Sequence, residues 1–281
     1  MTYGFLILTY EPKNDILDFI KQINETGKVE AYVVVDNNNY IPPKEMKKWV
    51  LQMDDEKCFK AGFNNVNFVI DKKITSWDKV LFMLCRGLRH LNFSWIVEDD
   101  VFVPSVQSVL EMTEKYKAYD LVTANDEGNP KELRNYWHWK HMPRYMDNKS
   151  LTLAVDDTHD PSRGWFHSMV CAMGISRNLL YIVNLQAMAY KQLMFIEFLF
   201  NTLCHQAGLK NTTAPEFENI VWRKAYKDIN WNEYDIVART KAYEAKLASR
   251  VSDESLTPAF TGLWFHPVKD RSIHSKIREM L

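Results

Sequence analysis

The sequence predicts an α/β fold in which a mostly parallel sheet is flanked by helices, within a single domain that spans residues 1–281. Three observations predict this fold. Short, continuous apolar runs of strand length recur through the first half of the chain, and patterns with helical spacing separate them. No internal repeat or low-complexity linker divides the chain. Strands of a parallel sheet are apolar throughout because both of their faces are covered, which is the pattern seen here.

Local signals place the elements in chain order. Strands are predicted over residues 4–9, 31–35, 66–70, 94–97 and 120–123, and a helix over residues 15–23. Thr75 begins another helix, because Asp78 completes a T-x-x-D start signal. Residues 125–161 are polar, aromatic and irregular, and a loop of this length is usually functional or disordered. The stretch GWFHSMVCAMGIS predicts a strand. Residues 177–208 predict one or two helices that end at Gly208, and residues 240–250 predict a charged helix.

The composition excludes several classes of protein. The chain has 281 residues, of which 46% are hydrophobic, so it can bury a sizeable core. Its 35 Lys+Arg balance 36 Asp+Glu, without the basic excess of proteins that bind nucleic acids or membrane surfaces. The cysteines are scattered without a C-x-x-C pair, which favours buried free thiols over disulfides or a zinc site. They are Cys58, Cys85, Cys171 and Cys204.

The apolar segments are too short for a membrane protein. The first residues, MTYGFLILTYEP, lack a basic leader and a cleavage site, so they indicate a strand instead of a signal peptide. The most apolar run, LMFIEFLF, is interrupted by a glutamate, and no stretch is long enough to span a bilayer. We therefore expect a cytoplasmic protein; the alternative is the lumenal catalytic domain of a protein excised from its membrane anchor.

An acidic triplet, Glu98-Asp99-Asp100, follows the apolar strand in SWIVEDDVFVPS. One interpretation is a solvated loop start, or an N-cap for the helix after Pro104. The other is a site for Mg²⁺ or Mn²⁺, since these ions bind carboxylates together with substrate phosphates. Adjacent carboxylates also repel one another unless a positive charge compensates. Ligands of parallel sheets gather beyond the carboxyl ends of the strands, where this triplet falls.

The strand, the triplet and the apolar residues after it resemble the D-x-D signature of GT-A-fold glycosyltransferases, which have a Rossmann-related sheet and use nucleotide-sugar donors. The resemblance implies that Asp100 ligates Mn²⁺ or Mg²⁺. It implies that Asp99 or Glu98 contacts the ribose or a metal-bound water. Glu98 stands where the family often has its first aspartate.

The resemblance extends to residues far from the triplet. Thr9, Tyr10 and Asp36 follow the first two strands, where the family binds the nucleoside: a ring can stack on a base, and a carboxylate can accept the N3–H of uracil. His266 in GLWFHPVKD matches a C-terminal histidine that contacts the metal or the diphosphate, and Lys269 would offset phosphate charge. The alternative for His266 is packing between its aromatic neighbours.

Glu197 lies inside the apolar run LMFIEFLF. Burial of an unpaired carboxylate costs roughly several kcal/mol, so the side chain either reaches solvent, pairs with a cation, or is needed for function. The stretch IEFLFNTLCHQAGL resembles the helix that supplies the base in inverting GT-A enzymes. This implies that Glu197 is a general base, with a pKa raised by apolar surroundings. Phe198 stands where many relatives carry a second acid.

Gly164 and Trp165 precede the predicted strand in PSRGWFHSMVCAMG. The resemblance implies a loop in which glycine allows close approach to the donor sugar and the indole ring contacts the acceptor; the alternative is a plain turn. Asp156 and Asp157 are rival carboxylates, and a retaining mechanism would follow if one of them reached the anomeric carbon.

Lys79 and Arg86 lie on the less apolar face of the helix that begins at Thr75. This position favours a solvated face, and contact with the donor is the alternative.

Together these residues predict a metal-dependent, inverting glycosyltransferase that moves a sugar from a UDP-sugar to a hydroxyl of a glycan acceptor. Residues 1–125 would bind the donor, and residues 126–281 would bind the acceptor and supply the base. The chain also resembles small soluble viral glycosyltransferases, some of which transfer xylose, so UDP-xylose is a candidate donor. The alternatives are a retaining enzyme of the same fold, a nucleotidyltransferase and a non-catalytic sugar-binding protein. A nucleotidyltransferase usually has a glycine-rich basic loop after its first strand, whereas LTYEPKNDI contains no glycine.

Overall fold

The computed structural model describes residues 1–64, 74–128, 166–221, 230–248 and 262–281. Its centre is a seven-stranded sheet with the order β3-β2-β1-β4-β8-β5-β9. Four neighbouring pairs are parallel, and β8 runs antiparallel between β4 and β5. The mostly parallel sheet flanked by helices is therefore confirmed. Its strands are β1 (Thr2–Thr9), β2 (Glu30–Val35), β3 (Val50–Gln52), β4 (Leu91–Glu98), β5 (Leu121–Thr123), β8 (Ala172–Ser176) and β9 (Asn211–Thr213).

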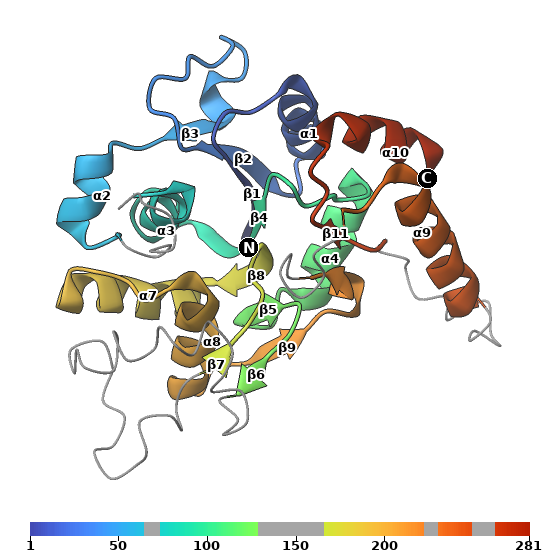
Figure 1. Ribbon diagram of the computed structural model, residues 1–281. Coiled ribbons are helices and arrows are strands. Elements are labelled where there is room, and N and C mark those ends of the chain that lie inside the picture. Colours follow the sequence, from blue (N-terminus) through green and yellow to red (C-terminus); the bar gives the residue numbers. More distant parts are fainter. Residues whose placement is uncertain (65–73, 129–165, 222–229, 249–261) are drawn as a thin grey trace.

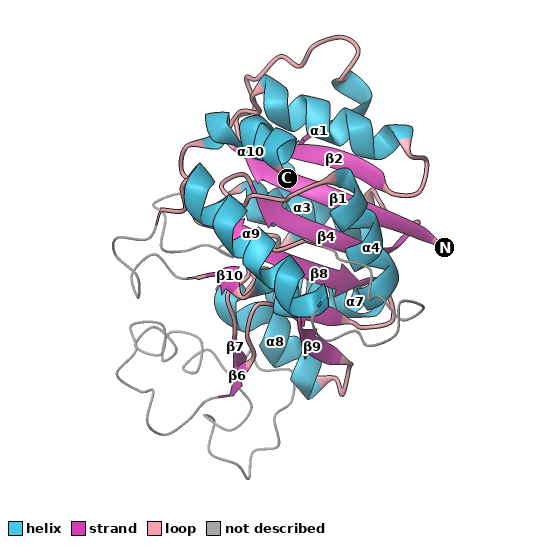
Figure 2. Cartoon of the chain, turned by 90° about the vertical axis from the view of Figure 1, so that its right-hand side faces the viewer, coloured by secondary structure: helices cyan, strands magenta, loops and turns pink. Residues whose placement is uncertain are grey.

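Helices cover both faces of this sheet (Figures 1 and 2). Successive strand residues point to opposite faces, so Leu6 and Leu8 pack on one side while Phe5 and Ile7 pack on the other. The first side is covered by α2 (Asp55–Ala61), α3 (Ser76–Arg86), α7 (Arg177–Tyr190) and α8 (Ile196–Gln206). The second side is covered by α1 (Asn14–Glu25) and α4 (Val106–Tyr116).

A smaller cluster packs beside the end of β4. It joins α9 (Glu233–Ala248) and α10 (His274–Met280) to the two-stranded sheet of β10 (Asn219–Ile220) and β11 (Phe265–His266). A second two-stranded sheet pairs β6 (Glu127–Gly128) with β7 (Phe166–His167). Three short 3₁₀ turns complete the described elements: η1 (Lys47–Trp49), η5 (Pro215–Phe217) and η7 (Arg271–Ile273).

Residues 262–281, named the C-terminal segment below, lie against the end of β4. The backbone N–H of Phe102 donates to the carbonyl of Phe265 at 2.8 Å, and the N–H of Val268 donates to the carbonyl of Asp100 at 2.8 Å. Two chain regions that are far apart in sequence therefore meet beside the acidic triplet.

Most of the local predictions agree with the structure. The strands predicted over residues 4–9, 31–35, 94–97 and 120–123 are β1, β2, β4 and β5, and the helix over residues 15–23 is α1. Thr75 and Asp78 form the expected capping box. Residues 177–208 form α7 and α8, and Gly208 has a φ of 63°. All four cysteines are buried and free, as predicted.

Other predictions differ or fall elsewhere. The single strand expected over residues 164–176 is divided into β7 and β8, and the helix expected at residue 240 begins at Glu233. The strand predicted over residues 66–70 and most of the loop over residues 125–161 lie outside the described residues. Within the described part of the chain, no helix has the length and apolar character needed to cross a membrane.

Candidate functional site

A cleft of about 220 Å³ lies beyond the carboxyl ends of β1, β2 and β4. These strands are parallel neighbours, and their register pairs Leu8 with Glu98 and Thr9 with Val35, so all three end at the same edge. The cleft brings together six residues singled out in the sequence. They are Thr9, Tyr10, Asp36, Glu98, Asp99 and Asp100.

Glu98, Asp100 and His266 form a cluster of candidate metal ligands at this edge. One ligand atom from each residue lies within 4.8 Å of the others. The Nδ1 atom of His266 is 3.0 Å from the carbonyl of Val221, which can only accept, so Nδ1 carries a proton and donates. That hydrogen bond orients the ring and directs Nε2 toward Asp100 Oδ1, 3.4 Å away.

The donor set of this cluster fits a divalent cation. Asp100 Oδ1 is buried and has no well-aligned hydrogen-bond partner in the part of the chain that the structure describes. Buried polar atoms are nearly always satisfied, so such an oxygen beside an oriented imidazole nitrogen suits a bound ion. The two carboxylates suit Mg²⁺ or Mn²⁺, and the added imidazole, a softer ligand, favours Mn²⁺ over Mg²⁺.

Each member of the acidic triplet has a different partner. Asp99 forms an ion pair with Arg271 and accepts a hydrogen bond from Thr9 Oγ1, while Asp100 Oδ2 pairs with Lys269. Glu98 accepts a hydrogen bond from the indole N–H of Trp77 at 2.8 Å. Lys269 and Arg271 therefore supply the positive charge that three adjacent carboxylates require.

These surroundings shift the carboxyl groups in different directions. Burial raises the pKa of Glu98, and the nearby charge of Asp100 adds to that effect. Burial also raises the pKa of Asp99 and outweighs the opposing effects of Thr9 and Arg271. For Asp100, burial is outweighed by His266 and Lys269, which hold its pKa well below the usual value.

The pKa of His266 is raised to about 11. Burial alone would lower it, but Cys171 and the carboxylate of Asp100 act in the opposite direction. In the absence of a metal ion, His266 therefore carries a proton on Nε2 as well, and a cation bound at this cluster would displace that proton. His266 is also only 6% exposed, so it is buried and contacts the acidic cluster at the same time.

The interpretation of the triplet as an N-cap is wrong. The helix after Pro104 is α4, and its N-cap is Ser105, whose side chain accepts from the backbone N–H of Ser108 at 3.0 Å. A hydroxyl one residue beyond the proline thus performs the capping, which leaves the carboxylates of the triplet for other contacts.

The solvated position expected for Lys79 is also wrong, because its side chain is 0% exposed. Its Nζ donates to the carbonyl of Asp36 at 2.7 Å and to Asn38 Oδ1 at 2.9 Å, and it pairs with Asp55 Oδ1 at 2.9 Å. These acceptors compensate for the burial of the ammonium group. Lys79 therefore lies beneath the turn after β2 and fixes it, while Arg86 is partly exposed at the end of α3.

Glu197 lies in the first turn of α8, with its side chain 14% exposed and Oε2 placed 3.4 Å from Nε2 of His167. The backbone N–H of Ser168 donates to the carbonyl of Glu197, and the N–H of Glu98 donates to the carbonyl of Cys171. Ser168 and Cys171 are three residues apart, a span of at most about 11 Å. One short segment therefore connects the start of α8 to the end of β4.

Four residues that the sequence singled out lie outside the described residues, namely Asp156, Asp157, Gly164 and Trp165.

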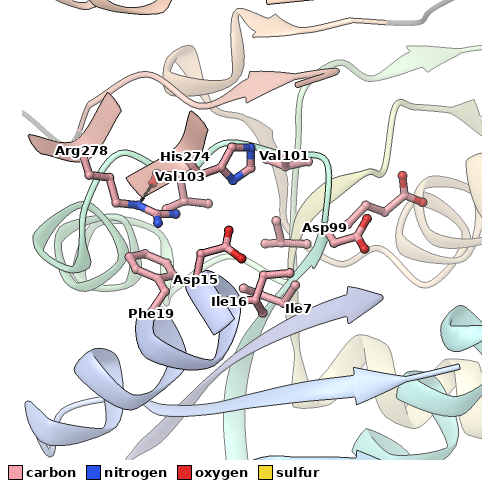
Figure 3. Close-up of a pocket in the computed structure, with 11 residues that line it drawn as sticks. Ile7, Asp15, Ile16, Phe19, Asp99, Val101, Val103, His274 and Arg278 are labelled. Atoms are coloured by element: carbon pink, nitrogen blue, oxygen red, sulfur yellow. Dashed lines mark hydrogen bonds between the residues drawn. The ribbon is translucent and has the colours of Figure 1, made fainter. Parts of the chain in front are cut away.

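Behind Asp99 is a second, much smaller cavity of about 10 Å³, enough for one water molecule. Figure 3 shows Asp15, Phe19, His274 and Arg278 around it, contributed by α1 and α10. It is too small for a substrate.

Several residues of the site were missed by the sequence analysis. Arg271 follows Lys269 by two residues, so the basic cluster KDR next to His266 was a usable signal. Trp77 was not singled out as a site residue, although a buried indole N–H normally requires an acceptor. No pattern in the sequence connected His167 to Glu197.

Comparison with known proteins gives structural similarity without sequence similarity. No family model matches the chain, and no curated protein matches it either. A complex of the galactosyltransferase LgtC with donor and acceptor sugar analogs gives a TM-score of 0.42 at 11% identity, over 99% of this chain and 96% of that chain. An active-site mutant of LgtC gives 0.43 at 9% identity, with coverage of 99% and 96%. Mouse xyloside xylosyltransferase 1, in its apo form, gives 0.38 at 13% identity, with coverage of 81% and 91%.

The fold and the site define an α/β protein with a candidate metal cluster at the carboxyl edge of its sheet.

Proposed function

We propose that this protein is a GT-A-type, metal-dependent glycosyltransferase that moves a sugar from a UDP-sugar to a hydroxyl of a glycan acceptor with inversion. One observation carries the proposal: Glu98, Asp100 and His266 converge beside a cleft formed by the ends of β1, β2 and β4. The D-x-D-like triplet at the end of β4 supports it.

The cleft offers a partner for each part of a nucleotide-sugar. Tyr10 is 64% exposed at its edge, so its ring is available to stack on the base, and the Asp36 carboxylate can accept the N3–H of uracil. Asp100, His266 and Glu98 would hold Mn²⁺ or Mg²⁺, which offsets the charge of the diphosphate and of the departing nucleotide. Lys269 lies beside Asp100 and adds a positive charge on the same side.

Glu197 is the proposed general base. As the acceptor oxygen forms its bond to the anomeric carbon, the bond from that carbon to the UDP oxygen breaks, and the hydroxyl proton passes to the Glu197 carboxylate. Attack from the face opposite the departing UDP inverts the configuration, provided the acceptor is held in line.

Calorimetric titration with UDP, with and without Mn²⁺, tests the donor site. Asp100→Asn should weaken the Mn²⁺-dependent binding of UDP by at least about tenfold, because it removes one charged ligand. Asp18→Asn, an exposed position on α1, is the matched control and should bind as the unmodified chain does. Binding of UDP that is independent of Mn²⁺ and of Asp100 would contradict the proposal and favour a non-catalytic protein.

A panel of UDP-sugars that includes UDP-xylose, assayed for UDP release, tests the reaction. Glu197→Gln should lower turnover by about 10²–10⁴-fold while UDP binding is retained, since only the base is lost. NMR of the first-formed product gives its anomeric configuration. A retained configuration, or near-normal turnover in Glu197→Gln, would exclude Glu197 as the base of an inverting reaction.

A further inference from the structure

A buried histidine lies between Glu197 and a second carboxylate. His167 is 1% exposed, with Nε2 placed 3.4 Å from Glu197 Oε2 and Nδ1 placed 3.8 Å from Glu127 Oε2. The Glu127 side chain is 40% exposed, whereas that of Glu197 is 14% exposed. The three groups therefore run in order from the proposed base to solvent.

The backbone fixes this order. Glu127 and His167 are directly opposite in the antiparallel pairing of β6 with β7, and side chains in such pairs stand next to each other on one face of the sheet. Asn125 donates to Oε1 of Glu127 at 2.7 Å, and the other oxygen, Oε2, faces the His167 ring.

Helix α8 is fastened to β7 on the other side. The backbone N–H of Ser168 donates to the carbonyl of Glu197 at 2.9 Å, and the N–H of Phe166 donates to Thr202 Oγ1 at 3.0 Å. The hydroxyl of Ser168 also donates to Asn201 Oδ1 at 2.5 Å. Figure 1 shows β6, β7 and α8 side by side. Since these contacts join regular elements, Glu197 has a defined position relative to His167.

We propose that His167 and Glu127 form a proton path that returns Glu197 to its ionised form after each transfer. This inference rests on the proposed function, in which Glu197 accepts the proton of the acceptor hydroxyl. An imidazole can take a proton at one nitrogen while it releases one from the other. With the ring proton on Nδ1 at the start, Nε2 of His167 takes the proton of Glu197, the Nδ1 proton passes to Glu127, and Glu127 releases it to water. Before the next transfer, Nε2 loses its proton to water that enters after the products leave, and Glu127 returns a proton from water to Nδ1, which restores the starting tautomer.

The charges around His167 suit this path. Among the described residues, Glu127 from β6 and Glu197 from α8 place carboxylates beside its ring, and the aromatic ring of Phe198 is 5.6 Å away. Two carboxylates stabilise the imidazolium that exists during the transfer. Separations of 3.4 Å and 3.8 Å exceed a hydrogen bond, and a small side-chain rotation or one bridging water closes each gap.

A second histidine, His205 on α8, provides a matched control. His205 Nε2 is 2.8 Å from Asp126 Oδ2, and its ring stacks on Phe166 at 3.6 Å. Asp126 also accepts from Asn201 at 2.6 Å. This pair also joins α8 to the β6–β7 sheet, so a change at His205 disturbs the packing of the same helix without altering the proposed path.

The first test detects the contacts of His167 directly, by NMR of protein labelled with ¹⁵N-histidine, with the ring resonances assigned from His167→Gln. Glu197→Gln should shift the Nε2 resonance of His167, because it replaces the carboxylate that lies 3.4 Å from that nitrogen. Glu127→Gln should shift the Nδ1 resonance, because Glu127 Oε2 lies 3.8 Å from it. The ring resonances of His205 should stay constant in both variants. An Nε2 resonance of His167 that is unchanged in Glu197→Gln would overturn the inference.

The second test measures turnover with the UDP-sugar that gives the highest UDP release. His167→Gln should lower kcat about 10–100-fold with KM for the donor unchanged, because it removes proton transfer and leaves donor binding intact. Added imidazole should restore part of the rate in His167→Ala. His205→Gln should keep its kcat, expressed per folded molecule.

The outcomes separate the two proposals. Normal kcat in His167→Gln, or equal losses in both histidine variants that follow their melting temperatures, would overturn the proton path alone. Near-normal turnover in Glu197→Gln would instead remove the base from the proposed function.

Discussion

Replacement of Lys79 by methionine removes a buried charge and keeps most of the side-chain volume. Lys79 is 0% exposed and makes close contacts to three oxygens, with distances of 2.7 Å to Asp36 O, 2.9 Å to Asn38 Oδ1 and 2.9 Å to Asp55 Oδ1. Hydrogen bonds to charged groups each contribute about 1.5–3 kcal/mol. The sum would be an overestimate here, because the Asp55 side chain is 43% exposed and water can replace the ammonium.

We therefore expect Lys79→Met to lower the free energy of unfolding by about 3 kcal/mol, the lower limit for breaking a buried pair. For a chain of this length, that corresponds to a fall in Tm of roughly 6–12 °C. UDP affinity should fall as well, since Asp36 and the turn after β2 lose their support.

Urea unfolding and thermal melting measure the effect, and Lys60→Met is the control. Lys60 pairs with Glu56 at 2.7 Å, but both side chains are 72% exposed, so its loss should cost no more than about 0.5 kcal/mol. If Lys79→Met melted at the same temperature as Lys60→Met, the reasoning that burial makes this lysine important would be refuted.

Three further changes test other contacts. Trp77→Phe keeps an aromatic ring but loses the 2.8 Å hydrogen bond from the indole N–H to Glu98. Mn²⁺-dependent UDP binding, measured by calorimetry, should weaken about tenfold. Unchanged binding would show that this hydrogen bond does not orient Glu98. Burial lowers the pKa of His274, beside the small cavity of Figure 3, from 6.5 to about 3, so the unfolded chain takes up this proton at a higher pH than the folded chain. Stability should therefore fall as the pH drops below 6.5, by about 2 kcal/mol near pH 5, and urea unfolding of His274→Gln should lack this contribution. Tyr116→Phe removes the 2.7 Å hydrogen bond to the buried Glu216 and should cost about 1–3 kcal/mol, whereas an unchanged urea midpoint would contradict that estimate.

The central strands could be predicted because burial on both faces requires a continuous run of apolar residues. The last six residues of β1 are all buried, as are the last three of β2, so their runs are apolar without alternation. The start of α3 could also be predicted from the sequence, since its capping box is formed by Thr75 and Asp78, which are three residues apart. The position of the acidic triplet at a strand end followed from these assignments.

Elements defined by distant partners could not be predicted. β3, β9, β10 and β11 have only two or three residues, too few for a periodic pattern. The antiparallel direction of β8 depends on the path of the preceding chain and has no local signal.

The same limit applied within the site. Lys79 was expected in solvent because its acceptors come from the turn after β2 and from Asp55, which helical spacing cannot reveal. The pairing of Asp99 with Arg271 joins residues 172 positions apart.

The contact between the C-terminal segment and the end of β4 makes that margin of the sheet a single cooperative unit. Detachment of the segment would break the Phe102 N–H bond to Phe265 and the Val268 N–H bond to Asp100 together, and would leave Asp99 and Asp100 without their cations. The amide of Phe102 belongs to the chain after β4, and the amide of Val268 belongs to the C-terminal segment. Both should therefore show the same free energy of opening in hydrogen exchange, because a single detachment exposes them. If Mn²⁺ binds at Glu98, Asp100 and His266 as proposed, it should raise that free energy for both amides equally, because His266 reaches the two carboxylates only while the segment is attached.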